Sequence, residues 1–212
     1  MMQGAPFQIS QFGVSVSGAP EPWREQFDRD CAVSFSGVFA PEYLAKLLER
    51  AAQANFADDF VEGIGWRAVE SPQRVGKALS LLLHSPALLR WFERATGSEP
   101  LRAVAGRLVE TRANQKDALG WHGDQDDLTR LLAVVINLSD RPFSGGQFQL
   151  RRKGESMPFL TFDHPEPGSM LVFAVRPELE HQVTPVTDGG PRRVYAGWFL
   201  IRPEFEHGVL GN

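Results

Sequence analysis

Hydrophobic residues between positions 41 and 97 recur at the spacing of α-helices. Pro41 stands at a favoured first helical position and precedes the first apolar stripe. A second stripe follows Ser71-Pro72 and runs to Ser85-Pro86, where the proline is expected to break it. A third stripe ends at Gly97, a residue typical of the position just beyond a helix. The first 30 residues are rich in Gly, Pro, Ser and Gln and show no sustained period, so we expect a loosely packed arm there, with one candidate strand.

After Pro100 the pattern changes to that of short strands. Six stretches rich in Val, Leu and Phe are separated by Gly, Pro and Asp: 101–112, 131–138, 147–152, 169–175, 182–186 and 193–201. Because no helix-length pattern separates them, we expect a largely antiparallel sheet. Helices followed by many short strands predict a mainly β fold, a double-sheet jelly roll with the N-terminal helices packed on one outer face.

The composition narrows the class of protein. The 212 residues are 42% hydrophobic and 23% charged, which fits one globular domain over residues 1–212. We expect an N-terminal arm and supporting helices in 1–100, the jelly-roll core in 101–201 and a short tail in 202–212. The net charge of −4 argues against nucleic-acid binding, which depends on clustered cations. The single cysteine, Cys31, excludes an internal disulfide, and no leader or membrane-length apolar run is evident, so a cytoplasmic protein is expected.

Two histidines and one carboxylate form a candidate metal site. His122 and Asp124 are two residues apart, so on an extended segment both side chains point to the same face. His181 stands 59 residues later, at the head of a predicted strand. Two histidines and a carboxylate on one face of an octahedron are the ligands of non-haem Fe(II) oxygenases, and they leave three positions open. A fourth ligand for structural zinc is missing, because the remaining candidate, His164, lies in an Asp-His-Pro turn that we expect to face solvent.

An arginine near the last strand is a candidate anion ligand. Its planar guanidinium can bind the distal carboxylate of a dicarboxylate through two hydrogen bonds. Arg192 and Arg193 are both available, and strand alternation places them on opposite faces. Parity alone does not choose between them.

These motifs together resemble a known family. Trp121-His122-Gly123-Asp124 is followed by the strand 134–138, by Ser144-Gly145-Gly146, by the strand 168–173 and by His181. Residues 101–201 are similar in this order to the prolyl-hydroxylase-like branch of the 2-oxoglutarate/Fe(II)-dependent oxygenase superfamily. The resemblance implies a double-stranded β-helix (jelly-roll, cupin-like) core buttressed by α-helices. An arginine six residues before a tryptophan also belongs to the pattern, and that spacing selects Arg192, six before Trp198.

The resemblance also implies an activity. His122, Asp124 and His181 would hold Fe(II), and Arg192 would bind 2-oxoglutarate, which is decarboxylated to succinate and CO2 as O2 hydroxylates an unactivated C–H bond. The implied substrate is a prolyl residue, an amino acid or a small metabolite, and ascorbate is a candidate requirement for sustained activity. Two tyrosines common in the family correspond here to Arg112 and Asn137, which we take as further candidate ligands of the co-substrate. Trp121 and Trp198 are candidates for lining the substrate pocket.

Three other functions remain open from the sequence. The first is a jelly-roll protein that binds a metal without redox turnover, and Arg192 argues against it. The second is a zinc-dependent hydrolase or isomerase, which would need a general base that the sequence does not reveal. The third is a nucleic-acid demethylase of the same chemistry, which the acidic balance disfavours. The sequence leaves the oligomeric state open.

Overall fold

The computed structural model describes residues 5–114 and 116–203. Within them the helices are α1 (Glu21–Asp30), α2 (Pro41–Ala52), α3 (Val75–Leu83) and α4 (Pro86–Thr96). The strands before α3 are β1 (Phe7–Ser10), β2 (Gly13–Val16), β3 (Ala32–Phe35), β4 (Phe56–Val61) and β5 (Gly65–Glu70). The strands that follow are β6 (Ala103–Thr111), β7 (Ala118–His122), β8 (Arg130–Asn137), β9 (Phe143–Gly145), β10 (Phe148–Arg152), β11 (Leu160–Phe162), β12 (Met170–Ala174), β13 (Leu179–Val183), β14 (Val186–Gly189) and β15 (Arg192–Leu200).

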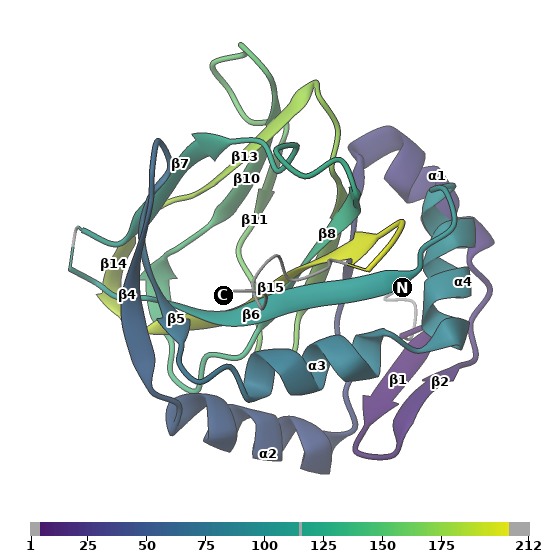
Figure 1. Cartoon of the computed structure of the whole chain (residues 1–212), viewed down its shortest axis with the longest axis horizontal. Coiled ribbons are helices and arrows are strands. Elements are labelled where there is room, and N and C mark those ends of the chain that lie inside the picture. The colour runs from purple at the N-terminus through teal and green to yellow at the C-terminus, as the bar shows by residue number, and fades with distance from the viewer. Residues whose placement is uncertain (1–4, 115, 204–212) are drawn as a thin grey trace, which may run out of the picture.

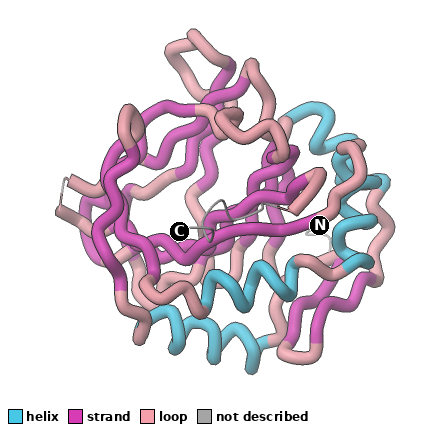
Figure 2. Tube along the Cα trace, in the orientation of Figure 1, coloured by secondary structure: helices cyan, strands magenta, loops and turns pink. Residues whose placement is uncertain are grey.

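Most of these strands form one curled sheet (Figures 1 and 2). Its order is β11-β10-β13-β7-β5-β6-β15-β8-β12-β3, with β4 paired to β5, and the strand pairs within it are antiparallel. Separate two-stranded ribbons are formed by β1 with β2 and by β9 with β14. The mainly β, antiparallel jelly-roll prediction is therefore confirmed.

The sheet curls so far that strands near its two ends face each other. Phe148 in β10 and Phe173 in β12 are far apart in strand order, yet their ring centroids are 4.6 Å apart. Both rings are almost fully buried. The inner face of the curled sheet therefore encloses an interior, and side chains that point inward from different strands can meet there.

The helices support the outer face of this sheet. α3 packs on β6, and Gly76 permits the close approach because a Cβ at that position would lie 2.9 Å from Arg107 Cα. Its N-terminus is capped by the Glu70 carboxylate, which accepts hydrogen bonds from the amides of Val75 and Gly76 at 2.8 and 3.0 Å. On β15, Tyr195 points toward the helix, and its hydroxyl lies 2.9 Å from Ser80 Oγ. Figure 1 shows α2 and α3 lying along the sheet below β5 and β6.

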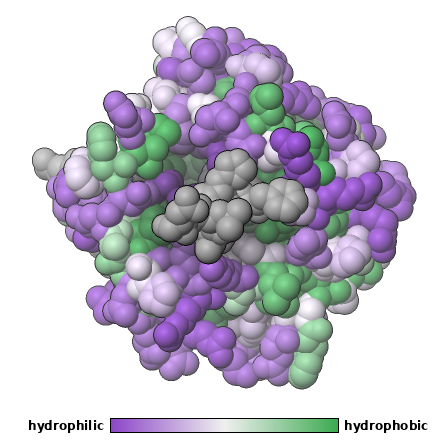
Figure 3. Space-filling model, viewed as in Figure 1, coloured by the Kyte–Doolittle hydropathy of each residue, from purple (hydrophilic) through white to green (hydrophobic). Residues whose placement is uncertain are grey.

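The predicted helices are confirmed within one or two turns of their ends. α2 starts at Pro41, α3 ends before Pro86, and α4 is closed by Gly97 at φ 64°, whose amide donates to the Glu93 carbonyl. On the face shown in Figure 3, hydrophilic residues predominate around the periphery. Among the residues described, no helix is both long and apolar enough to cross a membrane.

The prediction of a loosely packed N-terminal arm is wrong. That segment forms β1, β2 and α1, and the side chains of Phe7 and Ile9 are fully buried. Phe7 packs edge-on against Trp91 and Phe92 of α4, at 5.5 and 5.7 Å between ring centroids. Strands of four residues are too short to show a sustained period, which explains why the pattern was missed. The hairpin of β4 and β5 was not predicted, and the strand expected at 182–186 is observed at Leu179–Val183.

Candidate metal centre and active site

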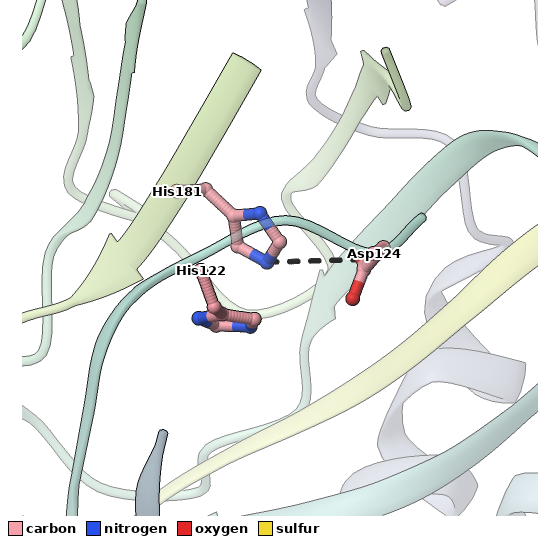
Figure 4. Close-up of side chains that lie close together, drawn as sticks. All are labelled: His122, Asp124 and His181. Atoms are coloured by element: carbon pink, nitrogen blue, oxygen red, sulfur yellow. Dashed lines mark ion pairs between the residues drawn. The ribbon is translucent and has the colours of Figure 1, made fainter. Parts of the chain in front are cut away.

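The predicted metal ligands converge on one point inside the curled sheet (Figure 4). His122 is the last residue of β7, Asp124 follows in the turn, and His181 is the central residue of β13. β7 and β13 are neighbours, and His181 is paired directly with His122. One ligand atom from each residue lies within 4.8 Å of the other two, and His181 Nε2 is 3.8 Å from Asp124 Oδ2. Such spacing permits all three side chains to bind a single ion.

Hydrogen bonds and burial prepare these side chains as ligands. His122 Nδ1 lies 2.7 Å from the Gly120 carbonyl, which can only accept, so Nδ1 carries the proton and Nε2 keeps a free lone pair. Burial lowers the pKa of His181 to about 4, although Asp124 raises it and His122 lowers it further. Its ring is therefore neutral at pH 7, as a metal ligand must be. The indole Nε1–H of Trp198 donates to Asp124 Oδ2 at 2.8 Å and holds that carboxylate in place.

The structure separates the two candidate arginines. Arg193 faces outward and forms ion pairs with Glu110 at 2.9 Å and Asp140 at 2.6 Å. Arg192 faces inward and is 2% exposed, and no ion pair to it occurs among the described residues. Its Nε has no hydrogen-bond partner, and burial lowers its pKa to about 10. Arg192 is therefore a buried cation, still protonated at pH 7, without a counter-ion among the described residues.

One cavity contains the three candidate metal ligands and Arg192. Arg192, Val194, Ala196 and Trp198 alternate along the inner face of β15 and line it together. Gly146 makes room for the arginine, because a Cβ there would lie 2.7 Å from Arg192 Cδ. The cavity therefore joins a metal-binding set to a cation, an arrangement suited to a metal-bound ligand with a distant negative charge.

Comparison with known families identifies this arrangement. Residues 108–200 match the family model described as the 2OG-Fe(II) oxygenase superfamily. The chain carries a 2OG-Fe(II) oxygenase domain. Enzymes of this superfamily use Fe(II), 2-oxoglutarate and O2. The two imidazoles and one carboxylate observed here are a donor set that fits Fe(II).

Solved structures share the fold of this oxygenase domain over most of the chain. A 2OG-Fe(II) oxygenase-family oxidoreductase from Burkholderia pseudomallei is 17% identical, with a TM-score of 0.66, covering 91% of this chain and 95% of its own. A prolyl-4-hydroxylase from Pseudomonas putida is 17% identical, with a TM-score of 0.63 and coverages of 85% and 98%. The α-ketoglutarate-dependent epimerase SnoN from nogalamycin biosynthesis is 15% identical, with a TM-score of 0.62 and coverages of 87% and 83%. No curated protein matches the sequence significantly.

Two of the expected co-substrate ligands lie away from the cavity of the oxygenase domain. The Arg112 guanidinium forms ion pairs with Asp117 and Asp58 at the end of β6, so its charge is already neutralised. The Asn137 side chain is buried, but its amide nitrogen donates to the carbonyls of His164 and Glu166 and its oxygen accepts from the Ser139 amide. Its hydrogen bonds therefore hold the loop before β12. The expectation that these two residues bind 2-oxoglutarate is not supported by their positions.

The two tryptophans predicted to line the substrate pocket differ in their position relative to the cavity. Trp198 lines the cavity beside Asp124. Trp121 does not line it, because it alternates with its neighbour His122 and points the other way, where the Arg151 guanidinium lies 4.0 Å from its ring centroid. Of these two candidates, only Trp198 is placed to affect the site.

Sequence reasoning missed the position of His164. The residue was expected to face solvent, yet it is 3% exposed, and both ring nitrogens lack a hydrogen-bond partner. The short strand β11 would have indicated that the chain turns inward here, but three residues are too few to show a strand pattern in the sequence. Phe162 in β11 is paired with the buried Phe148, and the His164 ring packs edge-on against Phe162, with centroids 4.7 Å apart.

Proposed function

We propose that the oxygenase domain hydroxylates an unactivated C–H bond of a prolyl residue, an amino acid or a small metabolite. In this proposal His122, Asp124 and His181 bind Fe(II), and Arg192 binds the distal carboxylate of 2-oxoglutarate. The fold similarity to a Pseudomonas putida prolyl-4-hydroxylase supports this direction. The similarity to SnoN, an epimerase, shows that the same fold also serves a different outcome.

The observation that carries the proposal is the buried guanidinium of Arg192, which has no ion-pair partner within residues 5–114 and 116–203 and lines the cavity of the three ligands. A buried charge without a partner destabilises the folded protein by several kcal/mol, in order-of-magnitude terms. A ligand that supplies the opposite charge would remove this cost. A protein that only held a metal, or a zinc hydrolase, has no need for this cation.

The bound iron and co-substrate supply the oxidising chemistry, in which 2-oxoglutarate, O2 and the substrate C–H group become succinate, CO2 and the alcohol. The residues of this chain position the reactants. His181 presents a neutral imidazole, the Gly120 carbonyl orients the His122 ring, and Trp198 orients the Asp124 carboxylate. Phe148 and Phe173 pack against the His181 ring, at 5.6 and 5.0 Å between centroids, and keep water from that side of the site.

The proposal is tested by measuring succinate formation with candidate substrates. The protein is incubated with Fe(II), 2-oxoglutarate and ascorbate in air, with prolyl peptides, free amino acids or metabolite extracts. A true substrate gains the mass of one oxygen atom and raises succinate formation in equal amount. Asp124→Ala should abolish both signals. Substrate-dependent succinate formation with a product that has gained no oxygen atom, such as an epimer, would refute the hydroxylase assignment while leaving the oxygenase chemistry intact.

Arg192→Met is the decisive variant for the co-substrate role, and Arg193→Met is its matched control. Both remove one guanidinium from adjacent positions of β15, but only Arg192 points into the cavity. The first variant should raise the KM for 2-oxoglutarate strongly, because the distal carboxylate loses its cation. The second should leave that KM unchanged. Equal effects of both variants would contradict the role of Arg192.

A further inference from the structure

The cavity of the metal ligands contains more cations than the co-substrate requires. Among the described residues, its charged lining consists of Asp124 and three arginines, Arg67, Arg107 and Arg192. In the proposed function, Asp124 binds the metal and Arg192 binds the distal carboxylate of 2-oxoglutarate. Arg67 donates through Nε to Asp59 on β4 at 2.8 Å, so the protein itself balances its charge. These roles give no reason for Arg107 to line the cavity.

Arg107 lies on the inner face of the sheet, in the middle of β6. It is paired with Ala196 on β15, and both residues line the cavity. The Arg107 guanidinium carbon is 5.9 Å from the centroid of the Trp198 ring, whose Nε1–H donates to Asp124 Oδ2 at 2.8 Å. Only the indole of Trp198 therefore stands between this guanidinium and a candidate metal ligand.

The side chains of Arg107 and Arg192 extend toward opposite ends of the cavity. The residue of β6 that is paired with Arg192 is Thr111, four positions from Arg107, which separates the two backbones by about 13 Å along the strands. Arg192 extends toward the turn before β10, since a Cβ on Gly146 would lie 2.7 Å from its Cδ. Arg107 extends toward Trp198. A carboxylate bound to Arg192 therefore leaves Arg107 facing the part of the cavity where the substrate would bind.

The wall of the cavity around these groups is mostly apolar. Val109, Val135, Val194 and Phe173 contribute to it. A charge on an apolar inner face is costly to bury, and an anion that binds it offsets this cost. A guanidinium has five N–H groups, so Arg107 can keep contacts with the protein and still bind a carboxylate through two parallel hydrogen bonds.

We propose that the substrate is a small carboxylic acid with an apolar body, and that Arg107 binds its carboxylate beside Trp198. This inference rests on the proposed function, because it takes the metal and the co-substrate to occupy the rest of the cavity. The apolar wall then holds the body of the acid between Arg107 and the metal ligands. A prolyl residue inside a peptide has a neutral amide in place of the carboxylate. The proposal therefore narrows the substrate to a free acid, a class that includes amino acids.

The test measures binding, without turnover, on the protein loaded with Zn(II) and saturated with 2-oxoglutarate. The probes are the common L-amino acids and a series of straight-chain and aromatic carboxylic acids. Each acid is paired with its primary carboxamide, which keeps the shape and removes the charge. Titrations followed by ligand-observed NMR should find at least one acid whose Kd is about tenfold to hundredfold lower than that of its amide, as expected for hydrogen bonds to a charged group. Binding by none of the acids, or equal binding of acids and amides, would overturn the inference.

Arg107→Met shows whether this residue causes the preference. The variant should raise the Kd of the acid to that of its amide and leave the Kd of the amide unchanged. Arg102→Met is the matched control, because Arg102 is exposed directly before β6 and does not line the cavity. It should bind both probes like the wild type. A preference that survives in Arg107→Met would place the carboxylate elsewhere, such as on the metal, and the inference would be wrong.

The Kd of 2-oxoglutarate, measured on the Zn(II)-loaded protein without a probe, separates this inference from the function on which it rests. Arg192→Met should raise that Kd, and Arg107→Met should leave it unchanged. If Arg192→Met leaves it unchanged, the proposed function fails. If Arg192→Met raises it but acids bind no better than amides, only the inference fails. If Arg107→Met raises it as much as Arg192→Met does, Arg107 belongs to the co-substrate site and the inference is wrong.

A second measurement needs no substitution and covers the case in which Arg107→Met does not fold. The Nε–H signals of the arginine side chains in the wild-type protein, assigned through bonds from the backbone, are followed by NMR as an acid or its amide is added. The Arg107 signal should move with the acid and stay in place with the amide. An Arg107 signal that responds to both probes alike, or to neither, would show that this guanidinium does not bind the carboxylate.

Discussion

Replacing Trp198 by phenylalanine should weaken metal binding without unfolding the protein. The indole Nε1–H donates to Asp124 Oδ2 at 2.8 Å, and the Asp124 side chain is only 12% exposed, so water does not readily replace the lost donor. Phenylalanine keeps a ring beneath the Arg130 guanidinium, which lies 4.0 Å from the indole centroid. The substitution therefore removes mainly one hydrogen bond to a candidate metal ligand.

The size of the effect follows from the charge on the acceptor. A hydrogen bond to an ionised group contributes about 1.5–3 kcal/mol. If most of this holds the carboxylate in its binding orientation, metal affinity falls by about tenfold to hundredfold, the range common for residues that orient metal ligands. The direction is clear because an unrestrained carboxylate must be ordered again when the ion binds.

Mn(II) binding followed by electron paramagnetic resonance measures this change, since the signal of free Mn(II) reports the unbound fraction. Trp121→Phe is the matched control, because Trp121 packs against the Arg151 guanidinium and does not line the cavity. It should bind Mn(II) like the wild type. If Trp198→Phe has wild-type affinity and an unchanged Tm, the idea that Trp198 positions Asp124 is refuted.

Three further predictions concern stability. Gly106→Ala should lower the free energy of unfolding by about 1–3 kcal/mol in urea titrations, because its Cβ would collide with the buried ring of Tyr195; an unchanged midpoint would contradict this packing. Arg112→Met should lower the Tm, because the buried Asp117 carboxylate loses its cation. The same variant should leave the Kd of 2-oxoglutarate unchanged. A higher Kd would show that Arg112 is a co-substrate ligand after all. Burial holds the folded-state pKa of His164 well below 6.5. Below pH 6.5 the unfolded chain therefore takes up a proton at this residue that the folded chain does not. The free energy of unfolding of the apo-protein should fall with decreasing pH, by up to about 1.4 kcal/mol per pH unit from this group. Urea titrations from pH 7.5 downward should show a shallower dependence for His164→Phe than for the wild type, and identical slopes would show that His164 is protonated in the folded state.

The parts of the fold with a long pattern were predictable. α2 and α4 carry apolar stripes bounded by Pro41 and Gly97, and β6, β8 and β15 are long enough for their alternation to be visible. The metal ligands were predictable for a different reason, since the two-residue spacing of His-x-Asp suggested that both side chains share one side of the chain, although Asp124 lies just beyond the end of β7. The third, His181, required the order of motifs along the chain.

The remaining parts depend on contacts that a linear pattern does not contain. Parity placed Arg192 and Arg193 on opposite faces, but only the curl of the sheet decides which face is enclosed. Arg112 has the chemistry of a carboxylate ligand, and it is diverted by Asp58, which lies on the unpredicted strand β4. His164 follows a three-residue strand, too short to indicate that its ring turns inward.

The most direct test of the account is an anaerobic titration of the iron-free protein with Fe(II) and 2-oxoglutarate, followed by visible absorption. Chelation of Fe(II) by a 2-oxo acid produces a weak metal-to-ligand charge-transfer band. The account predicts that this band appears in the wild type, is absent in Asp124→Ala, needs much more 2-oxoglutarate in Arg192→Met, and is unchanged in Arg193→Met. A folded wild-type protein that binds Fe(II) but gives no band with 2-oxoglutarate would contradict the proposed site.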